Sequence, residues 1–311
     1  MTLSKNTFET FKPAELKFEI SSFTPMLSCY LRWRRGRLWV YPATQDKVGV
    51  ALPALASEDW FRACLLRSSV KSVCIDPASG LSAVTLWSRA CEVAQKPLYL
   101  KLPSSASLPQ KRYPVAWAVK QGCDRMAALL LLLSLSPVLL VIAGLIKIQD
   151  GGSVFFTQQR VGQRGKLFRI IKFRSMVIDA EKLHSRVMAN QTGLHKLECD
   201  PRVTPLGRWL RKLSLDELPQ LINVLRGEMS LVGPRPWALY DAIRIKPELH
   251  QRLNALPGMT GAWQIEARSE QLDLDAVTEQ DLQYLKNWSL WQDLKILLLT
   301  VPSVLKGHGA Y

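Results

Sequence analysis

The sequence lacks several features that would place it in a common class of protein. Residues 1–10 contain no apolar core of the kind that a signal peptide needs. No cysteines and histidines have zinc-finger spacing, and no glycine-rich dinucleotide fingerprint follows a predicted strand. We therefore expect neither a cleaved leader, nor a zinc finger, nor a Rossmann-type nucleotide site.

Cysteine is scarce and irregularly placed. The 6 cysteines lie at positions 29, 64, 74, 91, 123 and 199, mostly beside apolar or small residues. Thiols in such surroundings usually serve as small core residues. Since metal-type pairing is missing, we expect reduced thiols and a cytoplasmic compartment.

Acidic residues are also few, because 26 Asp and Glu face 41 Lys and Arg, a formal net charge of +15. Such an excess suits an anionic partner: nucleic acid, acidic lipid headgroups or phosphorylated substrates. No base-recognition module is evident, so we expect no nucleic-acid partner. An apolar segment between basic flanks favours anionic membrane lipids instead.

Residues 69–102 predict a small α/β domain. A strand at 69–75 and a turn at 76–80 precede an amphipathic helix at 81–95, and a second strand follows at 98–102. These elements form a βαβ unit. We expect an accessory domain with its linker at residues 1–110 and a second domain at residues 111–311.

The only long apolar run extends from Met126 to Ile146, 21 residues without a charge. A straight helix of this length rises about 30 Å, enough to cross a bilayer core. However, Pro137 predicts a kink at its middle, where Ser134 and Ser136 can bond the freed carbonyls. Basic residues flank both ends, which favours both on the cytoplasmic side. A spanning helix and a re-entrant hairpin over 120–148, broken at Ser136 and Pro137, therefore both remain open.

Two adjacent carboxylates, Asp216 and Glu217, lie at a predicted helix start. Ser214 and Glu217 match a capping box, so one interpretation is purely structural. Nearby bases and a Pro-Arg-Pro turn around Arg235 favour phosphate chemistry instead. In that interpretation Asp216 is a nucleophile toward phosphorus and Glu217 a ligand of Mg²⁺, which screens the phosphate charge.

Other basic and polar residues complete the predicted site. Lys172 and Arg174 flank a strand end beside Ser175 and suit a diphosphate. Thr260 lies in a tight loop, and Arg268 could bind a phosphate or a sugar hydroxyl, although both are more often structural as single residues. The segment from Asp281 to Leu305 is amphipathic and suits either a membrane interface or a core.

From about Lys120 to Tyr311 the chain resembles the bacterial sugar transferases, monotopic polyprenyl-phosphate phosphoglycosyl transferases that initiate exopolysaccharide, capsule and O-antigen synthesis. The resemblance rests on several motifs in the expected order: Phe155-Phe-Thr-Gln, Lys172-Phe-Arg-Ser-Met176, Arg211-Lys-Leu-Ser-Leu-Asp-Glu-Leu-Pro-Gln-Leu221, Asn223-Val-Leu-Arg-Gly227, Met229-Ser-Leu-Val-Gly-Pro-Arg-Pro236, Pro257-Gly-Met-Thr-Gly261, Asn287-Trp-Ser-Leu-Trp291 and Gly307-His-Gly-Ala-Tyr311. The last two resemble the branch that uses UDP-hexoses.

The resemblance implies an α+β fold: a mostly helical monotopic catalytic domain with a re-entrant helix-break-helix, preceded here by the small α/β unit as a Rossmann-like remnant. It also implies a ping-pong enzyme on the cytoplasmic face of the membrane. Asp216 would attack the sugar-linked phosphate of a UDP-hexose, release UMP, and pass the phosphosugar to polyprenyl phosphate. Glu217 would match the Mg²⁺ ligand, and Arg211 and Arg235 the phosphate-binding positions. The oligomeric state is left open, with a homodimer as one alternative.

The chain departs from the family pattern at two places. The opening Lys-Arg-x-x-Asp is Lys120-Gln-Gly-Cys-Asp124 here, and the Asn-Gly-Arg or Ser-Gly-Arg expected before the tail is Glu266-Ala-Arg268. The second departure leaves the sugar undefined. A rival hypothesis is a catalytically silent membrane scaffold of a polysaccharide assembly complex, which the intact Asp-Glu pair argues against.

Overall fold

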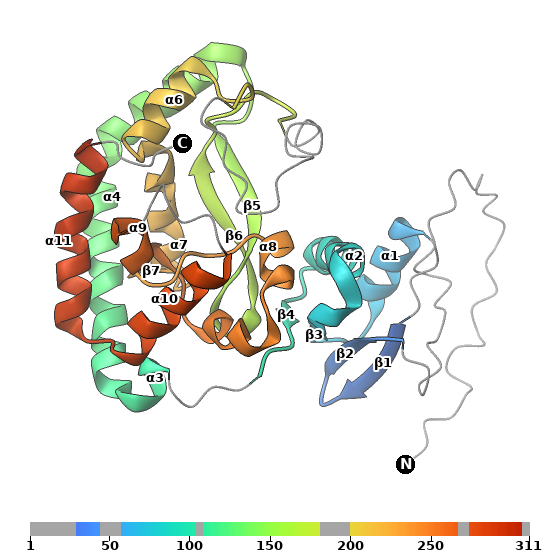
Figure 1. Cartoon of the computed structure of the whole chain (residues 1–311). Coiled ribbons are helices and arrows are strands. Elements are labelled where there is room, and N and C mark those ends of the chain that lie inside the picture. Colours follow the sequence, from blue (N-terminus) through green and yellow to red (C-terminus); the bar gives the residue numbers. More distant parts are fainter. Residues whose placement is uncertain (1–28, 44–56, 104–107, 181–199, 267–273, 307–311) are drawn as a thin grey trace.

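The computed structural model describes residues 29–43, 57–103, 108–180, 200–266 and 274–306, and shows a mixture of helices and strands (Figure 1). The predicted site residue Arg268 and the motif at 307–311 lie outside these residues. A small sheet with two helices occupies one side of the molecule, and the long helices α4 and α11 run along the other (Figure 1).

The first sheet contains the predicted βαβ unit. The hairpin β1 (Cys29–Arg34) and β2 (Arg37–Pro42) is antiparallel, and the sheet continues in parallel through β3 (Ser72–Ile75) and β4 (Leu98–Leu100). A short 3-10 turn, η3 (Pro77–Ser79), precedes the crossover helix α2 (Gly80–Val93), beside which α1 (Glu58–Arg67) packs. The helical spacing is confirmed, because Val84, Trp87 and Ala90 are buried.

The core of this sheet does not end at the predicted boundary, which falls within α3 (Pro109–Arg112). One continuous buried cluster joins Val73, Ile75 and Trp87 to side chains far along the chain, including Trp237 and Trp263. The division at residue 110 stays a prediction, but apolar packing crosses it.

Helix α4 (Pro114–Asp150) contains the apolar run and is the one described helix long and apolar enough to cross a membrane. Its hydrogen-bonded helix continues through Pro137, and its second half runs across the top of the domain at an angle to the first (Figure 1). Ser136 Oγ donates to Leu133 O at 2.8 Å, the carbonyl that Pro137 leaves without its N–H partner. The predicted compensation is confirmed for Ser136, whereas Ser134 Oγ donates to Leu131 O at 3.2 Å, and the re-entrant topology stays a prediction.

A second hairpin follows α4. Strand β5 (Phe155–Val161) pairs with β6 (Leu167–Phe173), with the 3-10 turn η4 (Gln163–Gly165) between them. The remaining chain supplies short elements around this hairpin. They are α6 (Pro205–Lys212), η5 (Leu215–Gln220), α7 (Leu221–Leu225), β7 (Ser230–Val232), α8 (Leu239–Arg244), η6 (Pro247–Asn254), β8 (Gly258–Thr260) and α9 (Ala262–Glu266), with β7 and β8 parallel.

Helices α10 (Leu274–Lys286) and α11 (Leu290–Lys306) close the structure. Helix α11 lies alongside the first half of α4 (Figure 1), and the ion pair between Lys120 and Asp293 joins the two. Both helices expose large apolar side chains, including Leu130 and Leu140 on α4 and Trp291 and Leu298 on α11. Only 11% of the most apolar stretch of α4 is buried, so this face is not the core of a soluble domain.

Candidate functional site

The two carboxylates lie in a 3-10 helix rather than at the start of an α-helix. Element η5 follows α6 directly, and Ser214 between them has a left-handed backbone with φ of 52°. The Ser214 side chain makes no capping bond, so the predicted capping box is wrong. The physical reason is the backbone conformation, since a capping residue normally has extended backbone. Glu217 is therefore available for other contacts.

Asp216 is buried, with 8% of its surface exposed, yet cations surround it. Burial raises the pKa of the Asp216 carboxyl, while Lys172, Arg211 and Arg235 act in the opposite direction. These three bases come from β6, from α6 and from the turn after β7. The structure thus brings Lys172 and Arg235, which lie far from each other in the sequence, to the neighbouring pair Arg211 and Asp216.

Glu217 makes two ion pairs that orient it toward the same bases. Its Oε1 lies 2.5 Å from Lys172 Nζ and 3.9 Å from Arg235 Nη2. Burial lowers the pKa of Lys172, and the neighbouring Glu217 carboxylate raises it. Carboxylates and basic side chains therefore lie next to one another in a partly buried region, where charge interactions are stronger than in water.

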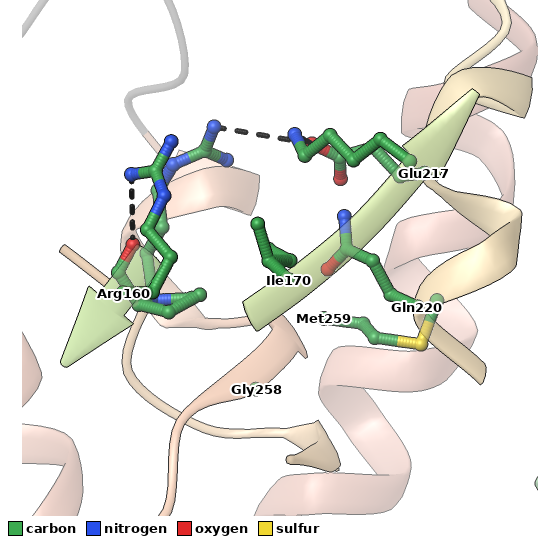
Figure 2. A pocket seen from close by; sticks show the side chains of 9 residues that line it. Arg160, Ile170, Glu217, Gln220, Gly258 and Met259 are labelled. Carbon is green, nitrogen blue, oxygen red and sulfur yellow. Dashed lines mark hydrogen bonds and ion pairs between the residues drawn. The ribbon is translucent and has the colours of Figure 1, made fainter. Parts of the chain in front are cut away.

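A pocket opens beside this cluster and is shown in Figure 2. Strand β6 lines it with Ile170 and Lys172, η5 lines it with Glu217 and Gln220, and β8 lines it with Gly258 and Met259. The remaining lining residues are Arg160, Arg235 and Pro236. Asp216 does not line the pocket itself, but the next residue, Glu217, does.

Arg160 is the main residue that the sequence prediction missed. The register of the hairpin places Arg160, Ile170 and Lys172 on one face, because Arg160 is opposite Phe168 and Gln158 is opposite Ile170. Burial lowers the pKa of Arg160 to about 10, which leaves it cationic at neutral pH. Among the described residues it makes no ion pair with a carboxylate, and it donates instead to Pro236 O at 3.1 Å and to Gln158 Oε1 at 2.6 Å.

Other predicted residues lie outside the pocket. Arg174 pairs with Asp150 at 2.6 Å and donates to Ser153 O, so it ties β6 to the end of α4. The Thr260 hydroxyl lies 2.9 Å from that of Thr300 on α11. Arg211 donates to Ser175 Oγ at 2.9 Å and also interacts electrostatically with the Asp216 carboxylate. Ser136 and Pro137 are in the exposed helix α4, as described above.

The arrangement suits a substrate with two linked phosphates. Arg160, Lys172, Arg211 and Arg235 outnumber the carboxylates Asp216 and Glu217, so the site carries excess positive charge. Guanidinium groups bind phosphate through paired hydrogen bonds. The described residues contain no cluster of three metal-binding side chains. Two adjacent carboxylates nevertheless fit Mg²⁺, which is commonly bound by one or two carboxylates together with substrate phosphates.

Most of the chain is similar to proteins of a known family. Residues 115–307 match the family described as bacterial sugar transferase. The chain is 45% identical over 181 residues to the galactosyl transferase CpsE of Streptococcus agalactiae, covering 55% of this chain and 40% of that protein. It is 42% identical over 200 residues to the undecaprenyl-phosphate galactose phosphotransferase of Salmonella typhimurium, covering 62% and 42%.

A third relative differs in the sugar that its name gives. The UDP-glucose:undecaprenyl-phosphate glucose-1-phosphate transferase of Caulobacter vibrioides is 43% identical over 205 residues, covering 62% of this chain and 72% of that protein. The chain thus spans less than half the length of the first two relatives. Its relatives include proteins named for galactose and for glucose.

Proposed function

The chain belongs to the bacterial sugar transferase family, and we propose that it transfers a hexose 1-phosphate from a UDP-hexose to polyprenyl phosphate, with undecaprenyl phosphate as the natural acceptor. The observation that supports this most directly is the buried Asp216 carboxylate beside Lys172, Arg211 and Arg235. The product, a polyprenyl diphosphosugar, would initiate an exopolysaccharide or lipopolysaccharide glycan.

The proposed reaction has two displacements at one phosphorus atom. In the first, a carboxylate oxygen of Asp216 attacks the sugar-linked phosphorus, and the bond from that phosphorus to the oxygen bridging to UMP breaks. UMP leaves with the electron pair, and a phosphosugar remains on Asp216. In the second, a phosphate oxygen of the polyprenyl phosphate attacks the same phosphorus, the bond to Asp216 breaks, and the carboxylate is restored.

The bases have separable roles in this proposal. Arg235 and Lys172 hold the diphosphate against Asp216 and stabilise the charge that develops during transfer. Arg211 and Arg160 raise the positive potential from two further sides. Glu217 would hold Mg²⁺, which would neutralise phosphate charge that otherwise repels the attacking Asp216 carboxylate. Arg174, Thr260 and Arg268 remain predicted substrate-binding residues.

The exposed apolar side chains of α4 and α11 support membrane attachment, which would bring the site to a lipid acceptor. We propose that the chain is monotopic on the cytoplasmic face, with α4 bent at Ser136 and Pro137 so that it enters and leaves one leaflet. Basic residues at both ends of α4 would then face anionic lipid headgroups.

The decisive experiment measures UMP release from a panel of UDP-sugars by the detergent-purified chain, with and without undecaprenyl phosphate. We expect sustained release only with the acceptor. Without it, intact-protein mass spectrometry should show an added hexose phosphate that disappears when the acceptor is supplied. Absence of UMP release with every UDP-sugar and acceptor would contradict the proposal and favour the scaffold hypothesis.

A further inference from the structure

The turn that presents Arg235 is fixed almost entirely through its carbonyl oxygens. Pro234 and Pro236 have no N–H to donate, so the backbone on either side of Arg235 can be anchored only as an acceptor. The carbonyls of residues 234–237 each accept a hydrogen bond: from Gly258 N at 2.9 Å, from Arg252 Nη2 at 2.6 Å, from Arg160 Nη1 at 3.1 Å and from Val161 N at 3.0 Å, in chain order.

The turn also packs closely against β8. A Cβ atom added to Gly258 would lie 2.1 Å from Gly233 N, so only glycine permits this approach of the two backbones. Strand β8 therefore fixes the position of the turn at Pro234. The orientation of the next residue depends on the donor to its own carbonyl, which is Arg252.

Arg252 reaches the turn from inside the protein. It is 2% exposed and does not line the pocket, so it does not touch a substrate there. Its guanidinium lies 4.7 Å from the centre of the Trp237 ring. It pairs with the Asp281 carboxylate of α10 through Nε at 2.7 Å and Nη2 at 2.6 Å. One planar group thus connects α10, the Trp237 ring and the Arg235 backbone.

We propose that Arg252, held by Asp281, is a positioning residue that orients Arg235 toward the phosphates of the substrate. The proposal rests on the proposed function, because it assigns Arg252 a role only through the phosphate-binding Arg235. The Asp281 carboxylate balances the buried charge of Arg252 and fixes the rotation of its guanidinium, so that Nη2 points at the Arg235 carbonyl.

A purely structural ion pair is the alternative, and side-chain chemistry separates the two. In Arg252→Lys the charge opposite Asp281 is kept, but the compact ammonium lacks the planar fork that serves Asp281 and the carbonyl together. In Asp281→Asn the guanidinium and its donor to the carbonyl are kept, but the buried charge loses its partner. Loss of one partner of a buried pair is strongly destabilising. The two variants therefore rank in opposite orders for activity and for stability.

The experiment compares these variants in the UMP-release assay and in thermal unfolding. We expect Arg252→Lys to lose roughly tenfold or more in kcat/KM, because small displacements of a positioning group are costly, with the smaller fall in melting temperature. We expect Asp281→Asn to melt at the lower temperature but to keep more activity per folded molecule. The proposal would be overturned if the same variant had both the lower activity and the lower melting temperature.

A double-mutant cycle adds the readout that a structural role would not change. In an Arg235→Ala background, Arg252→Lys should cause no further loss of activity, since its effect passes through Arg235. If Arg252→Lys reduces activity by the same factor in the Arg235→Ala background as in the wild-type chain, the proposal is contradicted. Lys246→Ala serves as the matched control, because Lys246 and Asp275 also join the η6 region to α10, but in an exposed pair. An inactive wild-type chain would contradict the proposed function rather than this inference alone.

Discussion

Two groups of charged and polar side chains lie partly or fully inside the protein, and they differ in how completely their members pair with one another. The closed cluster consists of Lys120, Asp124, Ser230, Tyr284, Trp288 and Asp293. The open cluster consists of Arg160, Lys172, Arg211, Asp216, Glu217 and Arg235. The closed cluster joins α4 to β7, α10 and α11, whereas the open cluster borders the pocket in Figure 2.

The closed cluster is internally complete. Lys120 pairs with Asp124 at 3.0 Å and with Asp293 at 2.8 Å. Asp293 accepts from Tyr284 at 2.5 Å and from Trp288 at 3.0 Å, while the Ser230 hydroxyl and the Leu231 N–H donate to Asp124. No side-chain N or O of this cluster is buried without a partner in the described part of the chain. Buried polar networks that are fully paired stabilise a unique structure.

The open cluster has a surplus of cations and leaves the Asp216 carboxylate with a raised pKa because of burial. Such an arrangement opposes folding unless a ligand completes it. The comparison teaches that buried charge alone does not identify a site. The balance of charge is more informative, because a surplus of cations favours an anionic ligand.

The largest expected effect is loss of activity in the open cluster. Asp216→Asn should abolish sustained UMP release and the phosphosugar adduct, because the amide is a poor nucleophile, while the melting temperature should not fall. Removing a buried carboxylate whose pKa burial has raised relieves a desolvation cost. Full turnover by this variant would remove the covalent route, and a large fall in melting temperature would remove the contrast between the clusters.

The next effect is loss of stability in the closed cluster. Asp293→Ala removes the partner of Lys120 and leaves the Tyr284 hydroxyl and the Trp288 N–H without an acceptor. We expect the free energy of unfolding to fall by about 3 kcal/mol, the low end for breaking a buried pair, because Lys120 keeps Asp124. Denaturant unfolding in detergent measures this. Wild-type stability would show that the closed cluster is not structural.

A smaller effect is expected from the pocket residue that the sequence prediction missed. Arg160→Met removes one cation and the donor to Pro236, and should raise KM for the UDP-sugar about tenfold, as expected for one charge-assisted hydrogen bond. Arg169→Met is a control on the same hairpin, because Arg169 pairs instead with Glu92 of α2. Equal effects of the two substitutions would place Arg160 outside the site.

The smallest effects concern two buried thiols, Cys74 in β3 of the first sheet and Cys91 in helix α2. Burial raises the pKa of Cys91 from 9.0 to about 12 and that of Cys74 to about 11. At pH 8 the native Cys91 should react with iodoacetamide on the order of 1,000-fold more slowly than in the unfolded chain, because the thiolate is the nucleophile.

The direction of the pH effect on stability follows from the same shift. The native state retains the thiol proton more tightly, so the free energy of unfolding should fall as pH rises from about 9 toward 12. The exposed Cys64 is the control and should react promptly in the native protein. Rapid labelling of Cys91 under native conditions would show that helix α2 and the first sheet separate readily.

Local patterns predicted the local elements well. The βαβ unit follows from strand and helix periods, and the role of Ser136 follows from the carbonyl that a proline frees. The Asp216 and Glu217 pair also stands out in the sequence. The capping box failed because a left-handed Ser214 depends on how α6 meets η5, which no local pattern records.

Residues that act through tertiary contacts could not be found in the same way. Arg160 joins Lys172 only through the register of the β5 and β6 hairpin. Arg252 meets the Arg235 carbonyl across a sequence separation of 17 residues and an intervening helix. Once the pairing of β5 with β6 is known, the alternation of faces along the two strands places Arg160 on the same face as Lys172. The sequence alone does not determine that pairing.

The apolar cluster that crosses residue 110 has a practical consequence for any shortened version of the chain. A fragment beginning at residue 111 would leave Trp237, Leu239 and Trp263 without the side chains of the first sheet that now cover them. Two of these three residues lie within five positions of Arg235. Removing the residues before 111 would therefore expose an apolar surface immediately behind the turn that presents Arg235, so the described part of the first sheet and its helices supports that turn.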